Sequence, residues 1–219
     1  MVGVLRSFEF PLTQYADDVQ RIVGTAIRRF GPEEWKLVLL TNEIHGHLGI
    51  YSTLGAKMGL RARELFGNPD HDHPLSVVSH AGLRPPVSCL NDGLQISTGA
   101  TLGHGLIRVA EVDTPCPEAT FTCEGKTLTL SLKEQYRTQI ETDIRTGVER
   151  YGHSPEYWAY VRSLALRYWS SWPSAAHRAI PERQRHCPLR HLRCHPTIER
   201  QCFRQVLRSG GTHQHQGFD

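Results

Sequence analysis

The stretch IHGHLGIYSTLGAKMGLRARELFG, residues 44–67, decides how the chain is expected to fold. It opens with two histidines separated by one glycine and runs without a proline to Gly67, a residue type that commonly follows a helix end. The spacing predicts a helix over about 48–66. Gly55 and Gly59 place small residues on one face of this helix, which indicates close packing against another backbone in the core.

Helical spacing recurs on both sides of this stretch. Amphipathic patterns predict four further helices, over residues 12–30, about 33–41, 133–151 and 155–171. Thr13 is expected to cap the first of them, and Gly31-Pro32 to separate the first from the second. The chain is therefore predicted to be rich in helices.

Short β-branched runs account for most of the remaining body. They predict four strands, over residues 75–82, 106–112, 119–125 and 126–132. Glu124-Gly125 suits a hairpin turn between the last two. We expect an α+β fold, with helices packed on a small, mostly antiparallel sheet and an irregular C-terminal tail.

Length and charge divide the chain in two. Its 219 residues suit one domain with an appendage, and we expect a domain over 1–172 and a tail over 173–219. The tail carries eight Arg and three acidic residues, a balance of 8 − 3 = +5. The body is left with 25 − 8 = 17 basic and 22 − 3 = 19 acidic residues, a balance of −2. A weakly acidic body argues against nucleic-acid binding.

Nothing in the sequence predicts a membrane protein. There is no run of about 18 apolar residues, as a spanning helix requires. The N-terminus lacks the basic and apolar regions of a secretory signal. We therefore expect a cytoplasmic protein, whose six cysteines would be reduced thiols or metal ligands in preference to disulfides.

The tail has three interpretations. It is rich in Arg, His, Gln, Cys and Pro, contains no Lys and has no sustained periodicity. Such a composition fits a non-native reading frame, and it also fits a disordered tail. The third interpretation is a small metal-binding module, for which the ligands would be Cys187, His191, Cys194 and Cys202.

His45-Gly46-His47 is the first motif with chemical potential. The glycine can adopt backbone angles that let the two flanking imidazoles converge, and neutral imidazole is a common metal ligand. The alternative is two surface histidines at the start of a helix.

The second motif is PPVSCLNDGLQISTGATLGHGLIRV, residues 85–109. If its first part is helical, Cys89, Asp92 and Gln95 fall on one face. A thiolate with two imidazoles would suit zinc or a similar divalent ion. The alternative is a buried inert cysteine, with capping residues and glycines that shape a turn.

Together the two motifs resemble the FmdE-like family of formylmethanofuran dehydrogenase proteins. In that family a His-Gly-His segment opening a helix is usually followed by Cys-Pro-Gly. A later segment reads Cys-x-x-Asp-Ala-x-Gln-x-x-Thr-Gly-x-Thr-x-Gly-Lys-Gly, which residues 89–105 match in spacing. The similarity is close over roughly 40–125 and extends in arrangement over about 10–170.

The resemblance implies a role for each matching residue. His45, His47 and Cys89 are the expected ligands of a divalent metal, with Zn preferred and Ni or Fe as alternatives. Asp92 and His104 are the expected catalytic groups that move protons. Gln95 and Thr98 are expected to line a pocket for a small molecule.

Three positions depart from the family pattern. Gly49 stands where the first Cys is usual, Gly93 where Ala is usual and His104 where Lys is usual. Three protein ligands with one open position are typical of a reactive zinc site, although a missing ligand is also compatible with a lost metal. His104 could be an acid or base, a replacement ligand or a loop histidine, and His80 is expected in a loop or at the surface.

Two functions follow from the resemblance. The first is a metal-binding protein that acts on a small molecule at the His/His/Cys site. The second is a non-catalytic accessory subunit or metal carrier for a molybdenum or tungsten enzyme. The resemblance also implies a homodimer. No residue set determines the reaction, so the sequence leaves open whether the protein is an enzyme.

Overall fold

The structure is a computed structural model that describes residues 12–69, 72, 74–152, 154–171 and 177–180. The chain divides into two units, Met1–Pro188 and Leu189–Asp219, and every described residue belongs to the first. The tail motifs at Cys187, His191, Cys194 and Cys202 lie outside the described residues.

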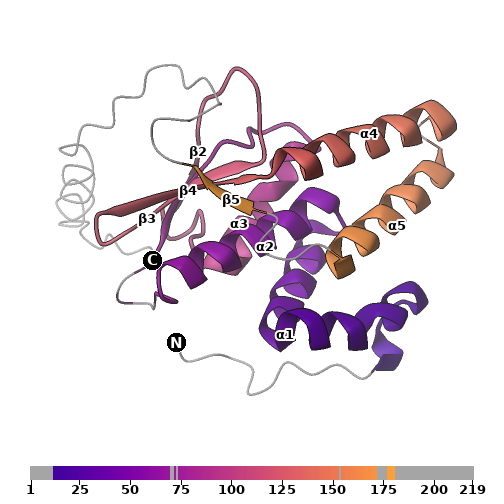
Figure 1. Cartoon of the computed structure of the whole chain (residues 1–219), viewed down its shortest axis with the longest axis horizontal. Coiled ribbons are helices and arrows are strands. Elements are labelled where there is room, and N and C mark those ends of the chain that lie inside the picture. Colours follow the sequence, from indigo (N-terminus) through magenta and orange to yellow (C-terminus); the bar gives the residue numbers. More distant parts are fainter. Residues whose placement is uncertain (1–11, 70–71, 73, 153, 172–176, 181–219) are drawn as a thin grey trace, which may run out of the picture. The chain divides into compact units, whose positions relative to one another are not determined.

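Five α-helices carry most of the described chain (Figure 1). They are α1 (Asp17–His45), α2 (Ile50–Leu65), α3 (Leu90–Thr98), α4 (Glu134–Tyr151) and α5 (Pro155–Ser171). Two short 3-10 helices, η1 (Leu12–Gln14) and η2 (Val87–Cys89), precede α1 and α3. The predicted helices are confirmed, with ends shifted by a few residues.

In the part of the chain that the structure describes, five strands form one mixed sheet in the order β2-β1-β3-β4-β5. They are β1 (Ser76–Ser79), β2 (Ile107–Val109), β3 (Glu118–Cys123), β4 (Lys126–Leu132) and β5 (His177–Ile180). Among these described strands β1 and β2 form the one parallel pair, and the other three pairs are antiparallel. The parallel pair requires a crossover, and η2 with α3 supplies it. The α+β prediction is thus confirmed.

Three local features test individual sequence predictions. Thr13 does not cap α1, because the helix starts at Asp17 after Ala16 and has no side-chain cap. The predicted break is found at Gly31, whose φ of 84° interrupts α1. Residues 177–180 form an edge strand although we expected no strand after 173. These residues form a strand because their backbone pairs with β4. Their sequence has no strand pattern, so the strand was not predicted.

Helix α2 lies at the centre of the core, and every residue from Ile50 to Leu60 is buried. It packs against α3 so closely that glycine is needed on both helices. A Cβ atom on Gly55 would lie 2.2 Å from the Leu90 carbonyl oxygen, and one on Gly93 would lie 2.2 Å from that of Ser52. The predicted small-residue face of α2 is therefore the contact with α3.

A buried ion pair joins α2 to the kink of α1. Lys57 is completely buried and pairs with the nearly buried carboxylate of Glu34. Its ammonium nitrogen also lies 3.8 Å from the ring centroid of Phe30, on the other side of the kink. Burial lowers the pKa of Lys57 and raises the pKa of Glu34.

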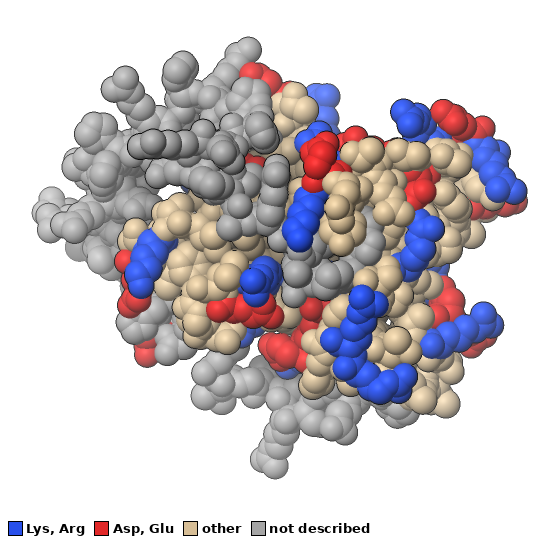
Figure 2. All heavy atoms as spheres, viewed as in Figure 1, with Lys and Arg blue, Asp and Glu red and all other residues tan. Residues whose placement is uncertain are grey.

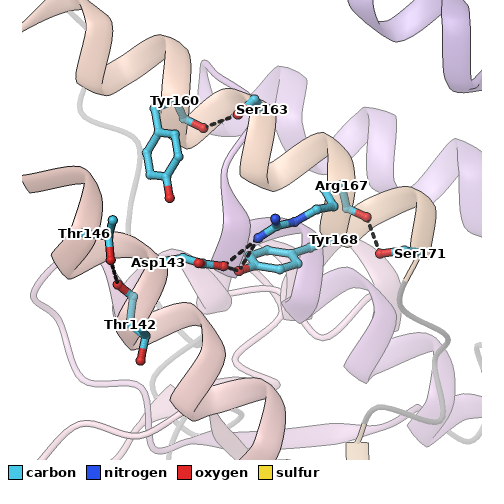
Figure 3. A network of polar contacts seen from close by, with 8 residues as sticks. All are labelled: Thr142, Asp143, Thr146, Tyr160, Ser163, Arg167, Tyr168 and Ser171. Carbon is cyan, nitrogen blue, oxygen red and sulfur yellow. Dashed lines mark hydrogen bonds and ion pairs between the residues drawn. The ribbon is translucent and has the colours of Figure 1, made fainter. Parts of the chain in front are cut away.

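Helices α4 and α5 lie side by side and are joined by a polar network (Figure 3). The buried Tyr168 donates its hydroxyl to Asp143, and Arg167 Nη2 lies 2.6 Å from the same carboxylate oxygen. The network links α5 to α4. Burial is the main reason that the pKa of Tyr168 is raised, and its bond to Asp143 adds to the effect.

The surface carries charges of both signs. Figure 2 shows basic and acidic side chains interspersed over the face in view. In the part of the chain that the structure describes, no helix is both long and apolar enough to span a lipid bilayer. His80, expected in a loop or at the surface, directly follows β1 and is buried, and its Nε2 lies 3.0 Å from Thr120 Oγ1 on β3.

Candidate functional site

The two sequence motifs meet where α1 ends, α2 begins and α3 passes alongside. Gly46 ends α1 in the left-handed conformation, with φ 81°, and its N–H donates to the Asn42 carbonyl oxygen. A residue with a side chain is strained in this conformation. The glycine thus ends the helix between His45, at its last position, and His47, which follows in the loop.

Asn42 holds this loop in place. Its Oδ1 accepts hydrogen bonds from Gly49 N at 3.0 Å and Ser52 Oγ at 2.9 Å. Its Nδ2 donates to Val38 O and to Thr53 Oγ1. Asn42 thereby connects the last turn of α1 to the first turn of α2. Asn42 is not among the residues predicted from the sequence, although its position one turn before His45 could have indicated a role in holding the loop.

His45 has one engaged and one unengaged ring nitrogen. Its Nδ1 lies 2.7 Å from Asp92 Oδ2 on α3. Its Nε2 is buried and has no hydrogen-bond partner among the described residues. Metal-binding histidines commonly use one nitrogen for the metal while the other contacts a carboxylate. In this chain the contact between His45 Nδ1 and Asp92 corresponds to the carboxylate contact of such histidines.

The unengaged Nε2 faces the position where the family pattern has its first thiol. A Cβ atom built on Gly49 would lie 3.0 Å from His45 Nε2 and 2.6 Å from Ser52 Oγ. Gly49 itself has extended backbone angles, φ −102° and ψ 148°, which any residue can adopt. A side chain at position 49 would thus lie directly beside the imidazole, and Ser52 or His45 would have to shift to admit it.

His45, Cys89, Asp92 and Gln95 line one cavity of about 360 Å³. We call it the α3 cavity. Apolar side chains from the loops and from β2 complete it: Leu83, Pro85, Leu102, Ile107 and Val109. Ser88 and Asn91 are the remaining lining residues. A volume of this size is in the usual range for small-molecule sites.

His47 lies beside His45 and also lines a different cavity. The two imidazole centroids are 4.3 Å apart. His47 is an exposed residue, and it helps to line a cavity of about 290 Å³ between α1 and α5. Desolvation lowers the pKa of His47, and the neighbouring His45 lowers it further. The neutral form, which can bind a metal, is therefore favoured.

The cysteines differ in state. Cys89 is half-buried and free, and burial, with a contribution from the charge of Asp92, raises the pKa of its thiol. Cys123 is also outside any disulfide and is buried on β3. Cys116 is disulfide-bonded, so the prediction of reduced thiols is wrong for this residue. The prediction relied on the expected compartment, which a sequence pattern does not establish.

The other predicted site residues have diverse positions. Gln95 lines the α3 cavity, and its Oε1 accepts a hydrogen bond from Leu102 N at 3.1 Å. Thr98 is not among the residues that line it; its hydroxyl donates to Leu94 O and accepts from Ala100 N, at the end of α3. His104 is exposed in the following loop and does not line the cavity either.

The metal ligands are not assembled in the conformation described. Among residues 12–69, 72, 74–152, 154–171 and 177–180, no three His, Cys, Asp or Glu side chains are grouped so that they could hold a metal ion. The structure brings His45 close to His47 and to Asp92, and places His45 and Cys89 on one cavity. A three-ligand site would require side chains to move.

A comparison with family models identifies the chain. No curated protein matches it. The model described as FmdE, molybdenum formylmethanofuran dehydrogenase operon, matches residues 44–165, which is more than half of the 219 residues. This range begins immediately before His45 and includes the whole of α2, α3 and the α3 cavity. The chain therefore belongs to the FmdE family.

Proposed function

We propose that the protein binds a divalent metal ion through His45, His47 and Cys89 and acts on a small molecule in the α3 cavity. The observation that carries the proposal is the buried Nε2 of His45, which lacks a partner among the described residues while Nδ1 contacts Asp92. A buried polar atom without a partner is costly, and a metal ion would satisfy it. In this proposal Asp92 orients His45.

The donor set favours zinc, with nickel or iron as alternatives. Imidazole and thiolate ligands suit all three ions. The position of Gly49 supports the same location, because the family's additional thiol would lie next to His45 Nε2. Without that thiol, three protein ligands would leave a coordination position open. A bound ion would supply Lewis acidity for a substrate carbonyl or a water molecule.

The first prediction concerns the thiol ligand. Changing Cys89→Ser is expected to weaken zinc binding about 100-fold, because serine is a much poorer ligand and even supporting residues contribute about 10–100-fold. Competition with a chromophoric chelator measures the affinity. Cys123→Ser is the matched control, since Cys123 is likewise outside any disulfide but lies on β3. Equal zinc affinity in the two variants contradicts the assignment. Cys116→Ser is unsuitable as a control because it removes a disulfide.

The second prediction concerns assembly. We propose a cytoplasmic homodimer, and exposed apolar side chains near the site support association: Leu83 is 79% exposed and Leu102 69% exposed. Closed two-fold pairs are the commonest oligomers. Light scattering at micromolar concentration is expected to give twice the chain mass. A monomeric mass that persists as the concentration rises shows that the proposal is wrong.

The alternative function is an accessory subunit or metal carrier for a molybdenum or tungsten enzyme. The family's description refers to the operon of such an enzyme, which supports this alternative. A carrier releases its zinc to an acceptor chelator within minutes and has no turnover. A metal-dependent enzyme retains the ion while it converts substrate. The rate of metal release therefore separates the two functions.

A further inference from the structure

The cavity between α1 and α5 is a candidate for a second ligand site, and we call it the α1–α5 cavity. It shares no lining residue with the α3 cavity. Its volume of about 290 Å³ is close to the lower end of the usual range for small-molecule sites, about 300–1,000 Å³. A cavity of this size suits a ligand of one or two rings.

Aromatic side chains form one wall of this cavity. Tyr15 and Trp169 line it, and Trp35, which is not among the lining residues, contacts both. The Trp35 ring is stacked on the ring of Trp169, with centroids 4.5 Å apart, and it meets the ring of Tyr15 edge-on at 5.6 Å. The three rings thus hold one another in place. An aromatic ligand would gain ring contacts with this wall that a saturated ring of the same size would not.

The same wall offers hydrogen-bond donors. The Tyr15 hydroxyl oxygen accepts from Trp35 Nε1 at 3.3 Å, which leaves the hydroxyl proton to be donated elsewhere. Within the described part of the chain, neither this proton nor the indole N–H of the buried Trp169 is donated to another residue. A buried indole N–H usually has a partner. A ligand with a carbonyl oxygen would supply an acceptor for this wall.

Glu43 supplies a hydrogen-bond acceptor on the same cavity. Its exposed carboxylate forms no ion pair or hydrogen bond with another described residue. Arg162, which also lines the cavity, donates to Asp18 instead, through Nε at 2.6 Å and Nη2 at 2.8 Å. Glu43 can therefore accept from an N–H group of a ligand. A lactam ring presents this N–H and the carbonyl oxygen side by side.

We propose that the α1–α5 cavity binds a neutral aromatic heterocycle that carries an N–H group next to a carbonyl group. The N–H donates to Glu43, the carbonyl oxygen accepts from the aromatic wall, and the ring lies against that wall. This inference goes beyond the proposed function, because it adds a second site. His47 lines this cavity and is also a proposed metal ligand. Since the ligand is neutral, an ion bound at His47 is neither needed for its binding nor repelled by it.

The test uses the full chain with one equivalent of zinc and three neutral lactams of similar size. 2-Pyridone has the aromatic ring, the N–H and the carbonyl group; 1-methyl-2-pyridone lacks the N–H, and 2-piperidone lacks the aromatic ring. Titrations followed by NMR rank their affinities. We expect 2-pyridone to bind about five- to tenfold more tightly than either analogue, because each analogue loses one of the two contacts. Equal affinities, or no saturable binding of 2-pyridone, overturn the inference.

Variants locate the binding. Glu43→Ala is expected to remove the preference for 2-pyridone over 1-methyl-2-pyridone and to keep the preference over 2-piperidone. Glu149→Ala, at an exposed glutamate on α4, is the matched control and changes neither ratio. Leu83→Ser alters the α3 cavity at an exposed side chain and leaves all three affinities unchanged. An unchanged ratio in Glu43→Ala, or weaker binding in Leu83→Ser, overturns the inference. The same ranking is expected before zinc is added, so a failure to bind zinc refutes the proposed function alone.

Discussion

Replacing Glu34 by leucine is expected to lower the free energy of unfolding by about 3–5 kcal/mol, the usual cost of leaving one member of a buried ion pair without its partner. Lys57 is fully buried on α2 and has Glu34 as its carboxylate partner. The Phe30 ring, with its centroid 3.8 Å from the ammonium, offsets only part of the loss. Urea denaturation measures the change. Lys57→Met is expected to cost a similar amount, because it leaves Glu34 buried.

The double variant separates a buried charge from a lost contact. Glu34→Leu with Lys57→Met removes both charges, and such replacements are often neutral or stabilising. We therefore expect most of the stability to return. Arg61→Met provides the control on the same helix, because its pair with Glu64 is solvent-exposed and contributes about 1 kcal/mol or less. A double variant that loses the sum of the two single losses contradicts this account.

The sequence could not reveal this pair, although it predicted both helices that carry it. Glu34 and Lys57 are 23 residues apart and belong to different helices. Helical spacing places a residue on a face, but it does not tell which helix covers that face. Lysine is normally exposed, so its burial on α2 follows only from the packing of the kinked α1 across it.

For the candidate site, the sequence named residues but did not predict the contacts between them. The family resemblance named His45, His47, Cys89, Asp92 and Gln95, and all of them except His47 line one cavity. That Asp92 contacts His45 was not predictable, because the contact joins residues 47 positions apart. Thr98 matched the family pattern equally well, and His104 was named although the family usually has lysine there. Their side chains nevertheless turn to local or exposed positions, which spacing along the chain does not specify.

For Gly93→Ala, the family resemblance and the packing in the structure predict different effects, so an experiment can separate them. Alanine is usual at this position in the family, so resemblance alone predicts that Gly93→Ala is harmless. In this chain the added Cβ would lie 2.2 Å from Ser52 O, 2.3 Å from Ala56 N and 2.6 Å from Gly55 C. All three are backbone atoms of α2, which cannot rotate away as a side chain can. The substitution therefore requires α3 to move from α2.

We expect Gly93→Ala to lower the free energy of unfolding by about 3 kcal/mol, at the upper end of the range for an overpacked core. The movement would also separate Asp92 on α3 from His45 at the end of α1, which now lie 2.7 Å apart. The ring nitrogen signals of His45 in NMR should change accordingly, and zinc affinity should fall with them. Gly103→Ala is the matched control, because its Cβ would meet only Thr101 Oγ1, at 3.9 Å. If both variants are equally stable and keep the same His45 signals, the close contact between α2 and α3 does not position the site, and the family's alanine is the better guide.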